Sequence, residues 1–264
     1  MKRPDKERVN VLGVHIDPLS VAELHARILA IVREEGHALV LHANVHGLNL
    51  CYREPELRSF FNAAPVVFCD GAGVRLGARI LGRRLPARIT YADWAWQLMD
   101  FAEREELSLF FLGARPGVAQ KAAARLKERY PDLKIAGAHH GYFDSTPGKP
   151  ENEAVLQEIN AARPDLLLVA FGMPLQERWL MRNWDRIDAR VALTGGAVFD
   201  YVSGELKRGP RILTDNGFEW LARLLIEPQR LWRRYVIGNP LFLLRVLKQR
   251  LTGNGEEPPR PRRV

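Results

Sequence analysis

The sequence predicts an α/β protein with a Rossmann-like, doubly wound and mainly parallel sheet, followed by a C-terminal helical appendage. Short apolar runs alternate with amphipathic segments of helix length, as in repeated β–α units. Several runs, such as VVFC, LFFL and LLLVAF, are apolar throughout, which is typical of strands buried on both faces of a parallel sheet. The strand signals stop near residue 206, and helical, basic sequence follows.

The elements follow from these patterns in chain order. Strands are expected at residues 9–14, 38–41, 66–69, 107–112, 133–137, 166–171 and 191–194. Helices are expected at 20–34, 55–63, 74–81, 91–105, 117–130, 152–162 and 175–183. Ser20 followed by Glu23 is a capping-box pattern, and it opens the first of these helices.

Length and charge indicate how the chain is organised. The 264 residues suffice for one large domain with an appendage. We expect a Rossmann-like domain over 1–205, a basic amphipathic helical appendage over 206–252 and a disordered tail over 253–264. The whole net charge of +8 lies after residue 205, which indicates a polyanionic partner for that end.

The composition also indicates a compartment. Cys51 and Cys69 form neither a CxxC pair nor a metal-ligand spacing, so a reducing cytoplasm is expected. The charged N-terminus lacks an apolar signal region, and no stretch approaches the ~20 apolar residues that span a bilayer. We therefore expect a cytoplasmic protein that is soluble or peripheral.

Unusual residues gather at the carboxyl ends of five expected strands, where parallel sheets bind ligands. In chain order they are His42 and Asn44; Asp70, Gly71 and Gly73; Gly113 and Arg115; Gly172, Pro174 and Gln176; and Gly195 with Gly196. A single glycine after a strand is usually only a tight turn. Together the five ends predict one ligand crevice.

Two of these strand ends are suited to phosphate. The segments 113–117 and 172–176 each lead into an expected helix, whose first N–H groups and dipole favour an anion. We therefore expect diphosphate binding there.

Asp70 follows an apolar strand directly, so its carboxylate is expected to be poorly solvated. Poor solvation raises a carboxyl pKa and suits a general base. The alternative is that Asp70 caps the next helix, with Gly71 in a turn.

Other chemistries have weak support. The glycines of Gly71-Ala72-Gly73 lack the acidic partner of a dinucleotide fingerprint, and His139-His140 lacks a metal-ligand spacing. The chain contains no DxD pair and no GxSxG nucleophile elbow. We therefore expect no metal and no cofactor, so that backbone dipoles and basic side chains handle the leaving-group charge.

Ordered motifs extend over residues 9–243. They are Asp70-Gly71-x-Gly73, Phe111-Leu112-Gly113, His140-Gly141-Tyr142-Phe143, Arg163-Pro164-Asp165-Leu166, Gly172-x-Pro174-x-Gln176-Glu177-x-Trp179, Gly195-Gly196-x-x-Phe199-Asp200, Gly204-x-x-x-Arg208-x-Pro210, Glu219-Trp220-x-x-Arg223-Leu224 and Glu227-Pro228-x-Arg230-Leu231-Trp232-Arg233-Arg234-Tyr235. In these blocks the chain resembles the WecG/TagA/CpsF family of bacterial glycosyltransferases, which includes teichoic acid N-acetylmannosamine transferases.

The resemblance implies an inverting transfer from a UDP-sugar to an undecaprenyl-diphosphate-linked saccharide in cell-surface polysaccharide synthesis. It implies that Asp70 is the base, that Asn44 orients a substrate and that Gln176 contacts the donor near its diphosphate. The implied nucleotide-sugar site consists of Gly113, Arg115, Tyr142, Gly172, Pro174, Gln176, Gly195, Gly196 and Asp200.

The chain departs from the family pattern at two places. His42 stands where threonine is common, and Tyr91-Ala92-Asp93 stands where Gly-Ser-Asp is common. Both lie near the expected sugar pocket, so the sugar stays open among N-acetylmannosamine, its uronic acid, glucose and similar sugars. His42 is expected to hydrogen-bond, with a share in proton transfer as the alternative.

The C-terminal segment has an interfacial amphipathic pattern. At 100° per residue, Arg223, Arg230 and Arg234 share one side with Arg233 close by, and leucines with Trp232 and Tyr235 lie opposite. We expect these arginines to meet a lipid diphosphate on the inner face of the cell membrane. Pro228 is expected to break the segment into two helices. The alternative packs the apolar stripe onto the core.

Two further classes of function stay open from the sequence. The basic end could bind nucleic acid, but its aromatic residues sit among leucines instead of along a basic groove, which favours lipid. A non-catalytic scaffold is the other class, and the presence of Asp70, Asn44 and Gln176 argues against it. Assembly into a homo-oligomer is also left open.

Overall fold

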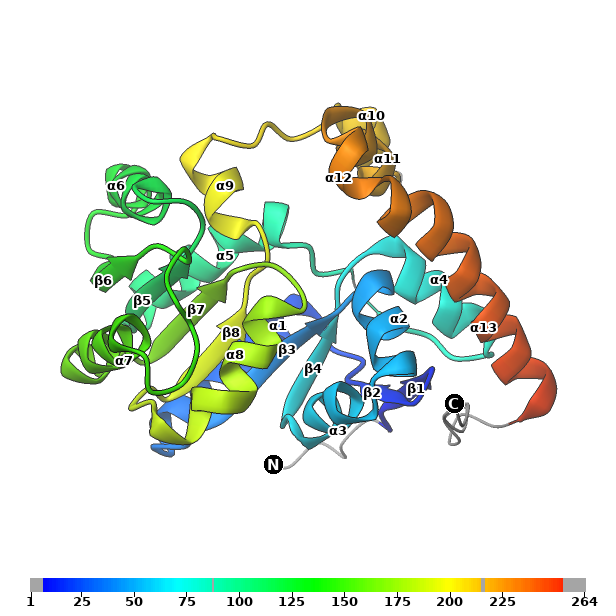
Figure 1. Cartoon of the computed structure of the whole chain (residues 1–264), viewed down its shortest axis with the longest axis horizontal. Coiled ribbons are helices and arrows are strands. Elements are labelled where there is room, and N and C mark those ends of the chain that lie inside the picture. The colour runs from blue at the N-terminus through cyan, green and yellow to red at the C-terminus, as the bar shows by residue number, and fades with distance from the viewer. Residues whose placement is uncertain (1–6, 87, 215–216, 254–264) are drawn as a thin grey trace. The chain divides into compact units, whose positions relative to one another are not determined.

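A computed structural model describes residues 7–86, 88–214 and 217–253 (Figure 1). Its main sheet has six strands in the order β4-β3-β8-β7-β5-β6. The strands are β3 (Ala38–Ala43), β4 (Val66–Cys69), β5 (Ser108–Gly113), β6 (Lys134–His139), β7 (Leu166–Ala170) and β8 (Val191–Thr194). The pairs β3–β8, β8–β7, β7–β5 and β5–β6 are parallel. The predicted Rossmann-like α/β class is confirmed.

The first predicted strand is two strands. Residues 9–14 were expected to be continuous, but β1 (Val9–Val11) and β2 (Val14–Ile16) form an antiparallel hairpin. The chain reverses at Leu12 and Gly13, which both have positive φ angles (54° and 84°). Glycine adopts this conformation without steric cost, and it allows the tight turn.

Contacts divide the chain into two compact units. Unit 1 consists of the described parts of Met1–Ser20, His42–Ile89 and Arg208–Val264, and unit 2 consists of Val21–Leu41 and Thr90–Lys207. In this division the C-terminal helices group with residues 42–89. The domain over 1–205 and the appendage over 206–252 stay a prediction. From residue 254 on, the expected disordered tail lies outside the described residues.

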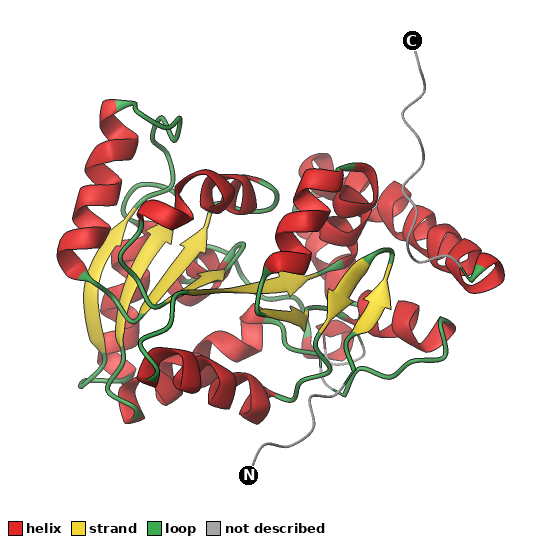
Figure 2. Ribbon diagram, turned by 90° about the horizontal axis from the view of Figure 1, so that it is seen from below, coloured by secondary structure: helices red, strands yellow, loops and turns green. Residues whose placement is uncertain are grey.

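In unit 2, helices pack around the strands. They are α1 (Val21–Arg33), α5 (Tyr91–Arg104), α6 (Val118–Arg129), α7 (Pro150–Ala162), α8 (Leu175–Asn183) and α9 (Val198–Ser203), with a 3₁₀ turn at Trp184–Arg186. Figure 2 shows helices on both faces of the strands. The strands β7 and β8 are buried along their whole length, as their uninterrupted apolar sequence predicts.

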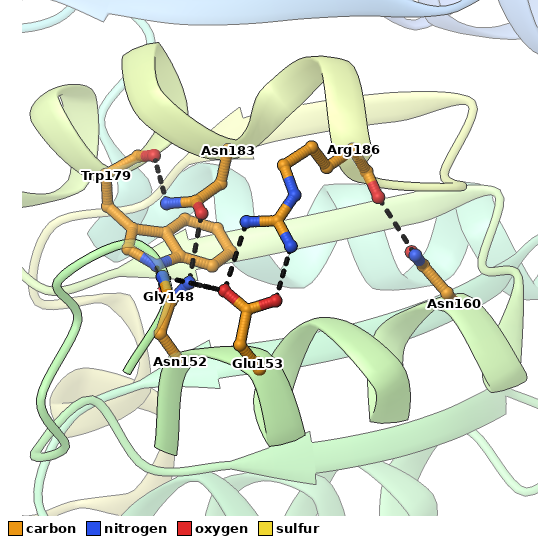
Figure 3. Close-up of polar contacts among 7 residues, drawn as sticks. All are labelled: Gly148, Asn152, Glu153, Asn160, Trp179, Asn183 and Arg186. Atoms are coloured by element: carbon orange, nitrogen blue, oxygen red, sulfur yellow. Dashed lines mark hydrogen bonds and ion pairs between the residues drawn. The ribbon is translucent and has the colours of Figure 1, made fainter. Parts of the chain in front are cut away.

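A polar network in unit 2 holds α7 against α8 (Figure 3). The Asn152 amide donates to Asn183 Oδ1 at 3.1 Å and accepts from Trp179 Nε1 at 2.9 Å. Next to it, Glu153 forms a two-contact ion pair with Arg186 and accepts from Gly148 N at 2.9 Å. These contacts lower the pKa of Glu153 to about 2, the hydrogen bond from Arg186 contributing most. The network thus fixes the loop before α7.

A half-buried histidine in unit 2, His25, predicts that the protein is less stable in acid. His25 Nε2 accepts a hydrogen bond from Trp94 Nε1 at 2.9 Å, and the His25 ring stacks on Phe101. Burial, and then the positive charge of Arg104, lower the pKa of His25 to about 4 from its usual 6.5. The unfolded chain therefore binds more protons between pH 6.5 and 4, so the free energy of unfolding falls as the pH drops through this window.

We expect His25→Gln, which keeps an acceptor but does not titrate, to reduce this fall by on the order of 1 kcal/mol, solvent screening included. Urea unfolding of both proteins at pH 7 and pH 5 measures the effect. An equal fall in both proteins would contradict it.

Unit 1 contains the hairpin and the remaining helices. They are α2 (Val45–Arg53), α3 (Pro55–Ala63), α4 (Ala72–Ile80), α10 (Arg211–Thr214), α11 (Glu219–Ile226), α12 (Pro228–Trp232), a π-helix at Arg233–Ile237 and α13 (Gly238–Thr252). The predicted break at Pro228 is confirmed, because α11 ends at Ile226 and α12 begins at Pro228. No helix in the described residues has both the length and the apolar character needed to cross a bilayer.

Helix α13 packs against the early helices of unit 1 (Figure 1). Gly77 on α4 leaves room for the Phe242 ring, since a Cβ there would lie 2.7 Å from Phe242 Cζ. Arg245 donates to Asn49 Oδ1 at 2.7 Å. Gln249 Oε1 accepts from Leu12 N at 2.8 Å. These contacts fix the C-terminal helix to the first quarter of the chain.

Candidate functional site

Asp70 lies at the carboxyl end of β4, as predicted. Its N–H donates to Ala43 O at 2.8 Å, which continues the sheet by one residue. The turn that follows needs a glycine, because Gly71 has a φ of 94°. Gly71 is also the N-cap of α4, and no side chain caps that helix. The alternative role of Asp70 as a helix cap is therefore not the observed one.

The surroundings of Asp70 keep it protonated to a higher pH than usual. Burial raises the pKa of Asp70 to about 6, although the positive charges of Arg234, Arg223 and Arg88 and a hydrogen bond from Asn44 each lower it. Desolvation outweighs these opposing effects because the carboxyl lies directly after a buried strand. A carboxylate with this pKa is ionised near neutral pH and is still basic enough to take a proton.

The arginines around Asp70 come from distant parts of the chain. Arg88 lies in the loop before α5, and its Nη1 donates to Thr214 O at 2.9 Å. Arg223 lies on α11 and contacts Glu227 at 3.6 Å. Arg234 lies in the π-helix, and its buried Nε has no hydrogen-bond partner among the described residues. A guanidinium N–H without an acceptor favours an anion beside it.

A second carboxyl belongs to the same cluster. Burial and the negative charge of Asp70 raise the pKa of Glu219, while Arg208, Arg88 and Arg223 lower it. Glu219 Oε2 is buried and accepts no hydrogen bond from residues 7–86, 88–214 or 217–253. We call Asn44, Asp70, Arg88, Arg208, Glu219, Arg223 and Arg234 the Asp70 cluster. Its four arginines and two carboxyls give it an excess of positive charge for an anion.

Sequence reasoning missed Arg88, Arg208 and Glu219 as site residues. Arg208 and Glu219 stand in the ordered family motifs, which was the available signal. Arg88 precedes the atypical Tyr91-Ala92-Asp93 segment in a loop without periodicity.

Asn44 and His42 lie at the end of the neighbouring strand, β3. Asn44 is the N-cap of α2: its Oδ1 accepts from Gly47 N at 2.9 Å, and its amide also hydrogen-bonds Asp70. His42 lies within β3 and is buried, with its ring near that of Phe68. Its burial supports the hydrogen-bonding role that we expected more than the share in proton transfer. One turn into α2, burial lowers the pKa of His46 to about 4, so its ring is neutral beside Arg234.

Gln176 belongs to unit 2, and its side chain forms hydrogen bonds within the protein. Its side chain is fully buried. Gln176 Oε1 accepts from Gly172 N at 3.2 Å and Gly196 N at 3.0 Å, and Nε2 donates to Glu177 Oε1 at 2.8 Å. The side chain therefore joins the loops after β7 and β8, and a direct contact with a donor has no support in this arrangement.

The other strand ends of unit 2 are also joined. Gly113 approaches β7 so closely that a Cβ would lie 2.4 Å from Ala170 O. Ala114 N donates to Ala170 O at 3.1 Å, and Gly141 N donates to Ala114 O at 2.9 Å. Gly195 N donates to Val169 O at 2.7 Å. We call residues 113–117, 140–143, 171–176 and 194–197 the unit 2 loops.

The remaining predicted nucleotide-sugar residues differ in availability. Tyr142 is 68% exposed. Arg115 is also exposed and lies 3.7 Å from Glu205. Pro174 follows a cis peptide bond, and the carbonyl of Asp200 accepts from Leu206 N at 2.9 Å. Tyr142 and Arg115 are therefore the most accessible of the predicted side chains.

The four predicted lipid-binding arginines separate into two pairs. Arg223 and Arg234 belong to the Asp70 cluster, and their positive charges act on Asp70. Arg230 and Arg233 are exposed; Arg230 contacts Glu227 at 2.8 Å, and Arg233 lies over the Trp232 ring. The apolar side chains that were predicted to share one side of the helix also differ in exposure. Leu231 and Tyr235 are buried, while Leu225 and Trp232 are exposed.

The two groups of predicted residues thus lie in different units. His42, Asn44, Asp70 and the arginines belong to unit 1, and the nucleotide-sugar residues belong to unit 2. That all of them form one crevice stays a prediction. Within the described residues, no group of three or more histidine, cysteine or acidic side chains is placed to hold a metal ion. Independence from metal is likewise still a prediction.

Comparison with known proteins identifies the family. Residues 9–256 match the glycosyl transferase WecG/TagA/CpsF family. Curated relatives from Staphylococcus aureus strains MRSA252 and NCTC 8325 are 27% identical over 249 residues, which cover 94% of this chain and 95% of each relative. Both relatives are named N-acetylglucosaminyldiphosphoundecaprenol N-acetyl-beta-D-mannosaminyltransferase. The match covers the sheet, the whole Asp70 cluster and the unit 2 loops, and the chain is a glycosyltransferase that belongs to the WecG/TagA/CpsF family.

Proposed function

We propose that the protein transfers N-acetylmannosamine, with inversion, from a UDP-activated donor to N-acetylglucosaminyl-diphosphoundecaprenol at the cytoplasmic face of a membrane. The observation that carries this proposal is the carboxyl of Asp70, held at the end of a buried strand with a pKa of about 6 and faced by arginines. The names of the relatives support the choice of sugar and acceptor.

The reaction is a single displacement. The acceptor hydroxyl oxygen forms a bond to the anomeric carbon while the bond from that carbon to the UDP oxygen breaks. The electron pair leaves with UDP, and the hydroxyl proton passes to a carboxylate oxygen of Asp70. Because Asp70 is mostly ionised near neutral pH, it can act as the general base. Asn44, hydrogen-bonded to Asp70, orients the carboxylate.

The arginines of the Asp70 cluster stabilise negative charge. A diphosphate is present both in the departing UDP and in the lipid acceptor, and a guanidinium binds its oxygens well. Arg234 is the strongest candidate because its Nε is buried and has no hydrogen-bond partner in the part of the chain that the structure describes. Fixed positive charge in a poorly solvated site favours charge that develops during the reaction.

The unit 2 loops are proposed to hold the nucleotide. A Cβ at Gly172, Gly196 or Gly117 would meet nothing within 4 Å, so a ligand can approach the backbone there. The side chains of Tyr142 and Arg115 are exposed and could contact the base and the phosphates. The backbone N–H groups of Gly172, Gly195 and Gly196 already have acceptors, so phosphate contacts would fall to other donors.

Incubation with a short-chain N-acetylglucosaminyl-diphosphoprenol and a panel of UDP-sugars, with products read by mass spectrometry and NMR, tests the function. We expect UDP-N-acetylmannosamine to be used and the new bond to have the inverted configuration. Use of another UDP-sugar alone would correct the sugar. Retention, or no transfer from any UDP-sugar, would overturn the proposal.

Membrane contact is proposed for the outer face of unit 1. Helix α13 presents exposed leucines opposite its packed face: Leu241, Leu244, Leu247 and Leu251. Its neighbour α4 presents the exposed arginines Arg75 and Arg79. Neither helix contains an acidic residue. Leucines with flanking basic side chains suit an anionic bilayer surface.

We expect Leu244→Asn/Leu251→Asn to weaken binding to phosphatidylglycerol vesicles by about tenfold, since these side chains are 65% and 85% exposed and lose apolar area to bury. Co-sedimentation measures the effect. Met181→Asn on α8, an exposed apolar position in unit 2, is the control. Equal binding by both variants and the wild type would contradict the membrane face.

A further inference from the structure

The side-chain amide of Gln176 can accept hydrogen bonds from Gly172 and Gly196 in only one of its two orientations. Its oxygen accepts from the N–H groups of Gly172 and Gly196. If the amide turned over, its NH₂ group would face these two donors, and both N–H groups would lose their acceptor. The oxygen and the NH₂ group are close in size, so packing alone discriminates weakly between the two orientations.

Glu177 supplies the discrimination. Its Oε1 lies 2.8 Å from Gln176 Nε2, and the side chain is fully buried beside Gln176. This oxygen accepts the hydrogen bond from Nε2, and an amide oxygen in the place of Nε2 would face it with a second acceptor. The contact with Glu177 Oε1 therefore decides which end of the amide meets the two glycines.

The two glycines determine the shape of the loops after β7 and β8. Gly172 and Gly196 have φ angles of 82° and 60°, a backbone conformation that glycine adopts without steric cost and other residues rarely adopt. Gln176 N also donates to Gly172 O at 3.2 Å, so the first loop is held from both sides. With the amide locked, both loops keep one conformation around the open space above the glycines.

We infer that Glu177 is a positioning residue for nucleotide binding: by orienting the Gln176 amide, it fixes the Gly172 and Gly196 loops in the form that receives the donor. The inference rests on the proposed function, in which the unit 2 loops hold the nucleotide. It gives Gln176 and Glu177 a joint role in place of a direct contact by Gln176.

A polarity swap tests the inference. Gln176→Glu alone places two carboxylates against each other, and Glu177→Gln alone leaves two amides with no preferred orientation. The double variant Gln176→Glu/Glu177→Gln restores a carboxylate–amide pair: one oxygen of the introduced carboxylate can accept from the glycines while the other accepts from the introduced amide. It also retains nearly the same volume, so it is expected to fold.

UDP alone is the probe, with its Kd from titration calorimetry and the Tm from a thermal scan. We expect each single variant to raise the Kd for UDP by about tenfold or more, because buried polar groups lose partners. The swap should return the Kd to within about threefold of the wild type. If Glu177→Gln does not fold, Glu177→Asp, which withdraws the carboxylate by one methylene, takes its place.

A control separates positioning from general loss of stability. Asn160→Ala, at the far end of α7 from the unit 2 loops, removes the hydrogen bonds from Asn160 to Arg186 O (Figure 3) and from Asp188 N to Asn160, so it should lower the Tm and leave the Kd for UDP unchanged. An unchanged Kd in Glu177→Gln, or a swap that regains the Tm without regaining UDP affinity, would overturn the inference alone. Failure of the wild type to bind UDP would overturn the proposed function as well.

Discussion

Asp70→Asn should lower the turnover of sugar transfer by about a thousandfold, the middle of the range for loss of a general base. The amide has nearly the same shape as the carboxyl but cannot accept the proton. The Kd for UDP should change little, because Asp70 acts on the acceptor hydroxyl. Turnover in the wild type should fall as the pH drops below about 6, where Asp70 takes up its proton.

The pH profile gives this prediction a second readout. The residual rate of Asp70→Asn should lack the acidic limb near pH 6, whereas Asp70→Glu should retain a titrating limb. Asp17→Asn is not a suitable control, because Asp17 accepts the backbone N–H of Val67 and pairs with Arg8. Asp100→Asn on the exposed face of α5 is suitable. Turnover of Asp70→Asn within tenfold of the wild type would disprove the assignment of the base.

Arg234→Met should reduce turnover by about a hundredfold, as expected when one preorganised donor to developing charge is lost. It should also move the acidic limb of the pH profile above 6. Among the charges that lower the pKa of Asp70, Arg234 has the largest effect, so its removal lets burial raise that pKa further. More of the base is then protonated at neutral pH.

The shift of the acidic limb in the pH profile distinguishes an electrostatic role of Arg234 from a general loss of stability. A destabilised protein loses activity at every pH, but its limb stays where it was. Arg104→Met, on an exposed arginine that pairs with Asp100 in α5, is the matched control and should leave both rate and limb unchanged. An unmoved limb in Arg234→Met would refute the coupling to Asp70.

Much of the fold could be read from the sequence because the strands are buried on both faces. Runs such as 166–171 have no polar interruption, and only a central parallel strand makes that pattern common. The helix α2 was missed, since its sequence includes Gly47 and Asn49 and depends on the cap at Asn44. Local propensity is weak there, and packing against α13 compensates for it.

The sequence could predict only those residues of the candidate site that directly follow a strand of the sheet. Asp70 and Asn44 follow adjacent strands, so the rule that ligands lie at strand carboxyl ends located both. Arg88 and Glu219 come from a loop and from a helix more than 100 residues apart, and no periodicity brings them together. The sequence singled out Gln176 but did not predict its contacts, because it does not reveal which N–H groups donate hydrogen bonds to the Gln176 side chain.

The packing of Phe242 on α13 against Gly77 on α4 has a consequence for biosynthesis. Arg223 and Arg234 reach Asp70 as part of a C-terminal segment whose last helix rests on α4. While the ribosome is still making that segment, the nascent chain has its carboxylate but lacks the cations that tune it. Under the proposed mechanism, a chain that ends before Arg223 would lack both cations and be inert, so catalytic competence would arise only near the end of translation.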